Sequence, residues 1–174
     1  MRRLAEAERI RAFMREIGEA AREETRVYFT GGTSAVLLGW RDRTIDVDVM
    51  FIPERDELLR ALPRLKDSMQ INVELSSPAD FIPELPGWEN RSVFVGREGS
   101  ASFYHYDFYA QALSKIERGH VQDRADVSRM LQDGLIEPGR LREMFESVLS
   151  SLYRYPAIDP GSFQRALEEV LAAR

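Results

Sequence analysis

Residues 25–51 read TRVYFTGGTSAVLLGWRDRTIDVDVMF, and this stretch decides the fold. Residues 27–30 have the β-branched and aromatic composition of a short strand, which Gly31 and Gly32 interrupt. Residues 33–38 then have the composition of a short helix, ended by a further glycine. The stretch therefore begins with a strand, a tight turn and a helix.

Residues 44–51 alternate between apolar and polar side chains, which predicts a strand with two different faces. Asp46 and Asp48 share the polar face, a few ångströms apart. Two carboxylates at so short a distance repel each other unless a cation lies between them. Hard cations such as Mg²⁺ prefer carboxylate ligands, and Mg²⁺ usually binds substrate phosphates at the same time. The alternative is a half-exposed strand with an acidic face and no ligand. The apolar face is predicted to carry Ile45, Val47, Val49 and Phe51.

Helical and strand patterns surround this stretch. An amphipathic helix of about five turns is predicted over residues 4–21, and Pro53 opens another that runs to residue 65. The next strand covers residues 71–75, and a proline-rich loop covers 78–87. Residues 92–95 and 102–106 form a predicted hairpin, followed by helices at 108–118, 121–133, 138–154 and 161–173. The order predicts an α+β fold: a small mixed β-sheet core with flanking helices over residues 1–107, and a helical C-terminal segment over 108–174 that completes the site.

Composition narrows the classes of function. With 24 basic and 29 acidic residues the net charge is −5, which disfavours a protein that grips long nucleic acid through its phosphates. The absence of cysteine excludes disulfides, thiolate metal sites and a cysteine nucleophile. The first residues lack the apolar run of a signal peptide, and no apolar run approaches the roughly 20 residues that span a bilayer. We therefore expect a cytoplasmic protein without a membrane partner.

Gly31-Gly32-Thr33 has the features of a phosphate-binding turn. Glycines let the backbone approach a ligand without interference from Cβ, the amides that open the next helix attract anions, and Thr33 adds a hydroxyl. The alternative is only a tight turn. The spacing and lysine of a Walker P-loop are missing.

Glu74 supplies a third carboxylate, on the polar face of the strand at residues 71–75. If this strand pairs beside residues 45–51, the three acids converge. Three acids and a phosphate-binding turn describe a two-metal site for phosphoryl or nucleotidyl transfer. Taken alone, Glu74 is equally well explained as a solvent-facing strand residue.

Gly31-Gly32-Thr33, twelve intervening residues and then Asp46-Val47-Asp48 resemble the signature of DNA-polymerase-β-like nucleotidyltransferases. The resemblance is closer to the bacterial minimal and abortive-infection branch, which includes toxins of some type IV toxin–antitoxin pairs. Residues 113–119, which contain Lys115, and residues 122–127, which contain Asp123 and Asp126, are similar to the second half of that signature. Other segments resemble an uncharacterised subgroup, and the resemblance covers roughly residues 25–132.

The resemblance implies a role for each matching residue. Gly31, Gly32 and Thr33 would hold triphosphate oxygens, and Asp46 and Asp48 would ligate two Mg²⁺ ions together with Glu74, which is also a base toward the acceptor. Lys115 would contact the triphosphate, and Asp123 or Asp126 would organise the site or accept a proton. Gln122 departs from the family, which often has Arg there. Lys115 is one of only two lysines among the 24 basic residues, as expected where a compact ammonium is required.

The expected function is Mg²⁺-dependent transfer of a nucleoside monophosphate from a nucleoside triphosphate to a hydroxyl on a tRNA end, a protein or a small molecule. A cognate antitoxin is the partner that the toxin branch implies. The alternatives are a non-catalytic nucleotide-binding relative and a helical interaction module formed by the C-terminal third. Arg41 and Arg43 are either phosphate ligands or part of a solvated loop, and His105 is expected as an ordinary strand residue. The sequence leaves the nucleotide, the acceptor and the oligomeric state open.

Overall fold

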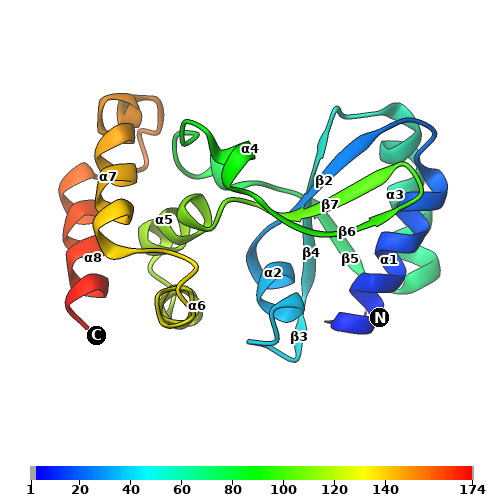
Figure 1. Ribbon diagram of the computed structural model, residues 1–174, viewed down its shortest axis with the longest axis horizontal. Helices are drawn as coiled ribbons and strands as arrows, with labels where there is room; N and C mark the ends of the chain where they lie inside the picture. Colours follow the sequence, from blue (N-terminus) through cyan, green and yellow to red (C-terminus); the bar gives the residue numbers. More distant parts are fainter. Residues whose placement is uncertain (1–2, 174) are drawn as a thin grey trace. The chain divides into compact units, whose positions relative to one another are not determined.

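The computed structural model describes residues 3–173, which form two compact units. Unit 1 contains the residues up to Ser77 together with Ser92–Tyr106. Unit 2 contains Pro78–Arg91 and the residues from Asp107 onward. The α+β class is confirmed, with a mixed sheet in unit 1 and helices in both units (Figure 1).

A five-stranded mixed sheet organises unit 1, in the order β5-β4-β2-β7-β6. β2 lies antiparallel to β4 and parallel to β7, β4 lies parallel to β5, and β6 and β7 form the expected antiparallel hairpin. Two short strands, β1 (Ala5–Glu6) and β3 (Arg43–Thr44), form a separate antiparallel sheet. The five strands are β2 (Thr25–Phe29), β4 (Asp46–Ile52), β5 (Asn72–Leu75), β6 (Val93–Glu98) and β7 (Ala101–His105).

The core of unit 1 lies between one face of this sheet and two helices. Helices α1 (Ala7–Ala20) and α3 (Asp56–Met69) lie side by side next to the sheet (Figure 1). Each helix turns its apolar stripe to the strands, so their side chains form one buried cluster. The strands contribute Val27, Phe29, Val47, Val49, Phe51, Val73 and Phe103 to this cluster. The polar positions of β4 and β5 therefore lie on the opposite face of the sheet.

Several predicted boundaries in unit 1 are wrong, each for a local reason. Ile45 is 70% exposed, because the strand breaks between β3 and β4 and Ile45 falls in the break. Helix α2 (Gly31–Leu37) begins at Gly31, so the glycines form its first turn instead of preceding it. Pro53 does not open α3, which starts three residues later with Arg55 as its N-cap. Leu4 precedes α1 and is partly exposed, so that helix is shorter than expected.

Unit 2 consists mainly of helices whose positions follow the sequence prediction. They are α5 (Phe108–Arg118), α6 (Val121–Gln132), α7 (Pro138–Val148) and α8 (Pro160–Ala172). Helices α7 and α8 run side by side (Figure 1), and the rings of Phe145 and Phe163 meet edge to face with centroids 4.9 Å apart. The expected helix over 138–154 ends as an α-helix at Val148 and continues as a 3₁₀ segment, η2 (Leu149–Arg154). Within residues 3–173, no helix has the length and apolar character required to cross a membrane.

Residues 78–91 belong to the helical unit, although the sequence analysis assigned them to the core before residue 108. This segment contains the 3₁₀ turn η1 (Pro78–Asp80) and the short helix α4 (Trp88–Arg91). The Arg91 guanidinium donates to the buried Asp107 carboxylate at 2.7 Å and 3.1 Å, and the Tyr155 hydroxyl donates to the Ala79 carbonyl at 2.8 Å. These links between residues distant in sequence explain why the segment packs with the helices.

Candidate functional site

The three predicted acids of unit 1 lie on adjacent strands and on one face of the sheet. β4 and β5 are parallel, with Asp46 opposite Asn72 and Asp48 opposite Glu74. Residues directly opposite each other on neighbouring strands project to the same face, with the strands about 4.8 Å apart. Asp46 and Asp48 are partly buried and Glu74 is exposed. The prediction that the two strands pair is confirmed, and the register places Asp48 directly opposite Glu74.

Asn72 links two of these acids. Its side-chain amide donates to Asp46 Oδ1 at 2.5 Å and lies 3.3 Å from Glu74 Oε1. A neutral amide thereby orients both carboxylates without neutralising them. Asn72 was given no role in the sequence analysis. Its position two residues before Glu74 on an alternating strand is the signal that could have identified it.

Gly31 and Gly32 are required by close contacts. Gly31 has a φ of +58°, and a Cβ there would lie 2.7 Å from Asp48 Oδ2. A Cβ on Gly32 would overlap the Thr44 hydroxyl and would lie 3.5 Å from Arg41 Nη1. The glycine turn therefore lies directly against the second aspartate of the pair. Since the backbone of this turn has no side chain to shield it, it is suited to approach a ligand held by Asp48.

The hydroxyl of Thr33, which was expected to contact phosphate, has a structural role. The side chain is fully buried, and its oxygen accepts the Asp48 N–H at 3.1 Å and lies 3.4 Å from the Asp46 carbonyl oxygen. These contacts hold α2 beside β4 and so fix the distance between the glycine turn and the aspartates. A contact between the Thr33 hydroxyl and a phosphate stays a prediction that these contacts do not support.

A layer beneath the glycine turn is anchored by His105, the last residue of β7. Its Nδ1 lies 2.9 Å from Ser34 Oγ, and the Ser34 hydroxyl donates to the Phe29 carbonyl at 3.2 Å. Burial lowers the pKa of His105 to about 4, so its imidazole is neutral at neutral pH. His105 is a strand residue, as expected. The link to Ser34, which ties α2 to the sheet, had no signal in the sequence because the two residues are 71 positions apart.

The acids are suited to a hard cation only with help from a ligand. Among residues 3–173, no group of three or more His, Cys, Asp or Glu side chains is arranged to hold a metal ion. Mg²⁺ in nucleotide enzymes is usually bound by one or two carboxylates, with substrate phosphates and water completing its shell. Asp46 and Asp48 supply such carboxylates, so the donor set fits Mg²⁺ bound together with a triphosphate. The binding of Mg²⁺, and Glu74 as its third ligand, stay predictions.

The second half of the predicted site is a buried ion-pair cluster in unit 2. Lys115 on α5 is only 3% exposed, and its Nζ lies 2.7 Å from Asp126 Oδ2 and 3.4 Å from Asp123 Oδ1 on α6. Arg118 also donates to Asp123 Oδ1, at 3.1 Å, and its guanidinium lies 5.2 Å from the Phe81 ring centre. The structure thus brings the three residues of this half together, and Arg118 completes a charge-balanced cluster of four side chains. It places them in a different unit from the acids of the sheet.

The two aspartates of this cluster differ. Asp126 makes the closer pair with Lys115, whereas the second oxygen of Asp123, Oδ2, is buried and has no hydrogen-bond partner among the described residues. An unpaired buried carboxylate oxygen is unfavourable by about 1–3 kcal/mol, so such atoms usually have a partner such as water or a ligand. The sequence could not rank these two residues, and this difference separates them.

No curated protein and no solved structure matches the chain. One family model, described as a nucleotidyltransferase of unknown function (DUF6036), matches residues 6–157, which include every predicted site residue. The match does not test the abortive-infection or toxin branch. It extends over most of the chain, and the protein therefore belongs to this family of nucleotidyltransferases of unknown function.

Proposed function

We propose that the protein is a Mg²⁺-dependent enzyme that transfers a nucleoside monophosphate from a nucleoside triphosphate to an acceptor hydroxyl. The observation that carries the proposal is the register of β4 and β5, which sets Asp48 beside Glu74 and against Gly31. Acids gathered on one face, next to a backbone turn without side chains, form a place for a metal-bound triphosphate. Membership of a nucleotidyltransferase family supports the reaction class.

In the proposed reaction, the acceptor oxygen forms a bond to the α-phosphorus while the bond from that phosphorus to the bridging oxygen of pyrophosphate breaks. Bound Mg²⁺, two ions by our expectation, would neutralise triphosphate charge and make the acceptor hydroxyl more acidic. Asp46 and Asp48 would hold the Mg²⁺ to which the phosphates bind, with Asn72 fixing the orientation of Asp46. The exposed Glu74 carboxylate would accept the proton that leaves the acceptor hydroxyl.

For unit 2 we propose that Asp123 and Asp126 have different roles. Asp126, 2.7 Å from the Lys115 ammonium, positions this lysine. Asp123, whose Oδ2 has no partner among residues 3–173, is the carboxylate able to accept one more hydrogen bond, from a water or from the acceptor. A contact between Lys115 and the triphosphate then requires the ammonium to exchange one carboxylate for a phosphate oxygen. The flexible stem and three donors of lysine make that exchange feasible.

The acceptor is proposed by class only, as a hydroxyl on a tRNA end, on a protein or on a small molecule. Uncontrolled transfer to tRNA or to a cellular protein would be toxic. A cognate antitoxin would restrain this transfer, so the toxin role is compatible with the same chemistry. These assignments depend on the resemblance of the sequence to the toxin branch.

The experiment is a labelling survey. The purified chain is incubated with Mg²⁺, tRNA, cell extract and each of the four nucleoside triphosphates labelled at the α-phosphate. Label is expected in one acceptor class with one nucleotide, and it should disappear in Asp48→Asn. The matched control is Asp42→Asn, an exposed aspartate on the loop before β3, which should retain transfer. Binding of Mg²⁺ and triphosphate by the wild type without any transfer would instead favour the non-catalytic alternative.

A further inference from the structure

The residues of unit 1 assigned to the proposed site are acids and small residues, and none of them is a cation that could bind the phosphates. A nucleoside triphosphate carries about four negative charges, and enzymes that bind it usually add Lys or Arg side chains to the metal ions. The lysine implied by the family signature lies in unit 2 and is already paired with two carboxylates. A basic side chain of unit 1 beside the glycine turn would fill this gap.

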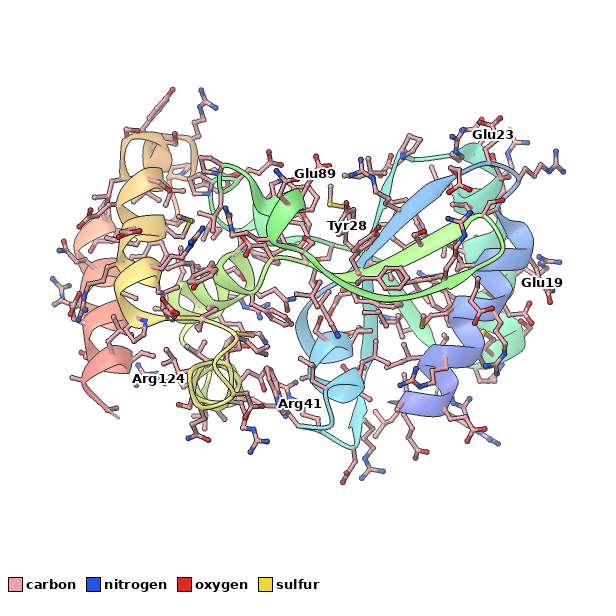
Figure 2. All side chains as sticks on the ribbon, in the orientation of Figure 1. Glu19, Glu23, Tyr28, Arg41, Glu89 and Arg124 are labelled. Atoms are coloured by element: carbon pink, nitrogen blue, oxygen red, sulfur yellow. The ribbon has the colours of Figure 1, made fainter. Side chains whose placement is uncertain are left out.

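Arg41 is in that position. After α2 the chain folds back, because the N–H groups of Trp40 and Arg41 both donate to the Ala35 carbonyl, at 2.9 Å and 3.4 Å. This reversal returns the Arg41 guanidinium to the first turn of α2, where Nη1 lies 3.5 Å from the Cβ position of Gly32. Arg41 is labelled in Figure 2, close to α2 and β3.

The two glycines are thus flanked by opposite charges. Asp48 Oδ2 lies 2.7 Å from the Cβ position of Gly31, and Arg41 Nη1 lies on the side of Gly32. The side chain of Arg41 is partly buried, unlike that of Arg43 two residues later, which is exposed. Guanidinium groups bind phosphate through two parallel N–H donors, a geometry that a backbone turn without side chains leaves accessible.

We propose that Arg41 binds the phosphates of the metal-bound nucleoside triphosphate at the Gly31-Gly32 turn. The inference rests on the function proposed above and adds a phosphate-binding residue from unit 1. It chooses between the two interpretations that the sequence allowed: Arg41 is a phosphate ligand, whereas Arg43 is an exposed residue of β3. Since the contact is to phosphate, it favours triphosphate over monophosphate and is indifferent to the base.

The test measures binding by calorimetry with the full chain, Mg²⁺ and each of ATP, GTP, CTP and UTP, and with the corresponding monophosphates. Arg41→Gln is expected to weaken triphosphate binding about tenfold or more and to weaken monophosphate binding much less. The matched control, Arg43→Gln, is expected to change triphosphate binding less than about twofold. Arg41→Lys should fall between the wild type and Arg41→Gln, because it keeps the charge and loses the fork.

Different binding results would contradict the role of Arg41 and the proposed function. If the wild type binds triphosphate and Arg41→Gln binds it as tightly as Arg43→Gln does, Arg41 has no role at the phosphates and the inference is overturned. If the wild type binds none of the four triphosphates, the proposed function fails and takes the inference with it. Thermal melting checks folding; if Arg41→Gln is unfolded, Arg41→Lys decides, with a loss of triphosphate binding of about threefold or more in support and equal binding against.

Discussion

The acidic face of unit 1 and the ion-pair cluster of unit 2 use carboxylates in opposite ways. In the sheet, Asp46 and Glu74 have the neutral amide of Asn72 as their partner, so their charges are oriented but not balanced. In the helices, Asp123 and Asp126 lie against the ammonium of Lys115 and are buried with it. The first arrangement calls for a cation from outside the chain, and the second supplies its own.

Because of this difference, substitutions in the acidic face of unit 1 should mainly affect catalysis, and substitutions in the ion-pair cluster of unit 2 should mainly affect folding. Removing a carboxylate from the sheet relieves repulsion and removes a ligand for the proposed metal. Removing a charge from the helical cluster leaves an unpaired charge in the interior, which is far more unfavourable than the intact pair.

Asp48→Asn is expected to reduce nucleotide transfer at least a hundredfold, because it removes a charge that would hold the metal-bound phosphates. The rate is measured with the labelled acceptor found in the survey. Asp42→Asn, which changes an exposed aspartate by the same chemistry, should stay within about twofold of the wild type. Retention of the wild-type rate by Asp48→Asn would remove the acidic face from the mechanism.

Lys115→Met is expected to lower the free energy of unfolding by about 3–5 kcal/mol, because it removes the ammonium that lies against two buried carboxylates. Denaturation with urea measures the loss. The double variant Lys115→Met with Asp126→Leu should recover part of it, since a buried pair replaced by apolar groups leaves fewer charges unpaired. Lys66→Met, at the other lysine, is the control and should lose less than about 1 kcal/mol. An equal, small loss in both single variants would show that the cluster does not stabilise unit 2.

His105 extends the comparison to the layer under the glycine turn, where a neutral buried group replaces charge. Its pKa is lowered to about 4 in the folded chain from an ordinary value of 6.5. The unfolded chain therefore takes up a proton at a pH where the folded chain does not, and stability is full above about pH 6.5 and falls as the pH drops toward about 4. Between about pH 7 and about pH 5 this group should lower the free energy of unfolding by about 2 kcal/mol.

Urea denaturation at the two pH values measures that decrease. In His105→Gln it should be smaller by about 2 kcal/mol than in the wild type, whereas His120→Gln, at an exposed histidine, should match the wild type. An unchanged decrease in His105→Gln would mean that His105 does not carry this pH dependence.

Gly32→Ala is expected to lower the free energy of unfolding by about 1–3 kcal/mol, because its Cβ would overlap the Thr44 hydroxyl. Gly139→Ala in α7 is the control, since nothing lies within 4 Å of its Cβ position and alanine favours a helix. Equal stability of the two alanine variants would show that the glycine turn can relax away from β3.

Local patterns predicted the elements that carry the site. The alternation at residues 44–51 identified β4 and its buried face at Val47, Val49 and Phe51, because the two faces of that strand differ sharply in polarity. Glycine and proline positions fixed most of the helices of unit 2. Ile45 was misplaced because the alternation continues through a break between two strands, and no local pattern marks such a break.

Contacts between residues distant in the chain could not be predicted from the sequence. The Asn72 amide joins Asp46 and Glu74 only because β5 pairs with β4 in one particular register. Residues 78–91 pack with the helices through the ion pair of Arg91 and Asp107. The spacing of these two residues in the sequence does not predict that they pair. The rarity of lysine marked position 115 as special, but its burial between two aspartates depends on how α5 and α6 pack together.

The central claim, that the acidic face of unit 1 binds a metal-bound triphosphate, is tested most directly by calorimetry, because binding needs no knowledge of the acceptor. The wild type is titrated with each nucleoside triphosphate in Mg²⁺ and again in EDTA, and Asp46→Asn is titrated in Mg²⁺. We expect at least one triphosphate to bind in Mg²⁺, with an affinity at least tenfold weaker both in EDTA and in Asp46→Asn. Equal affinity in all three titrations, or no binding by the wild type, would contradict it.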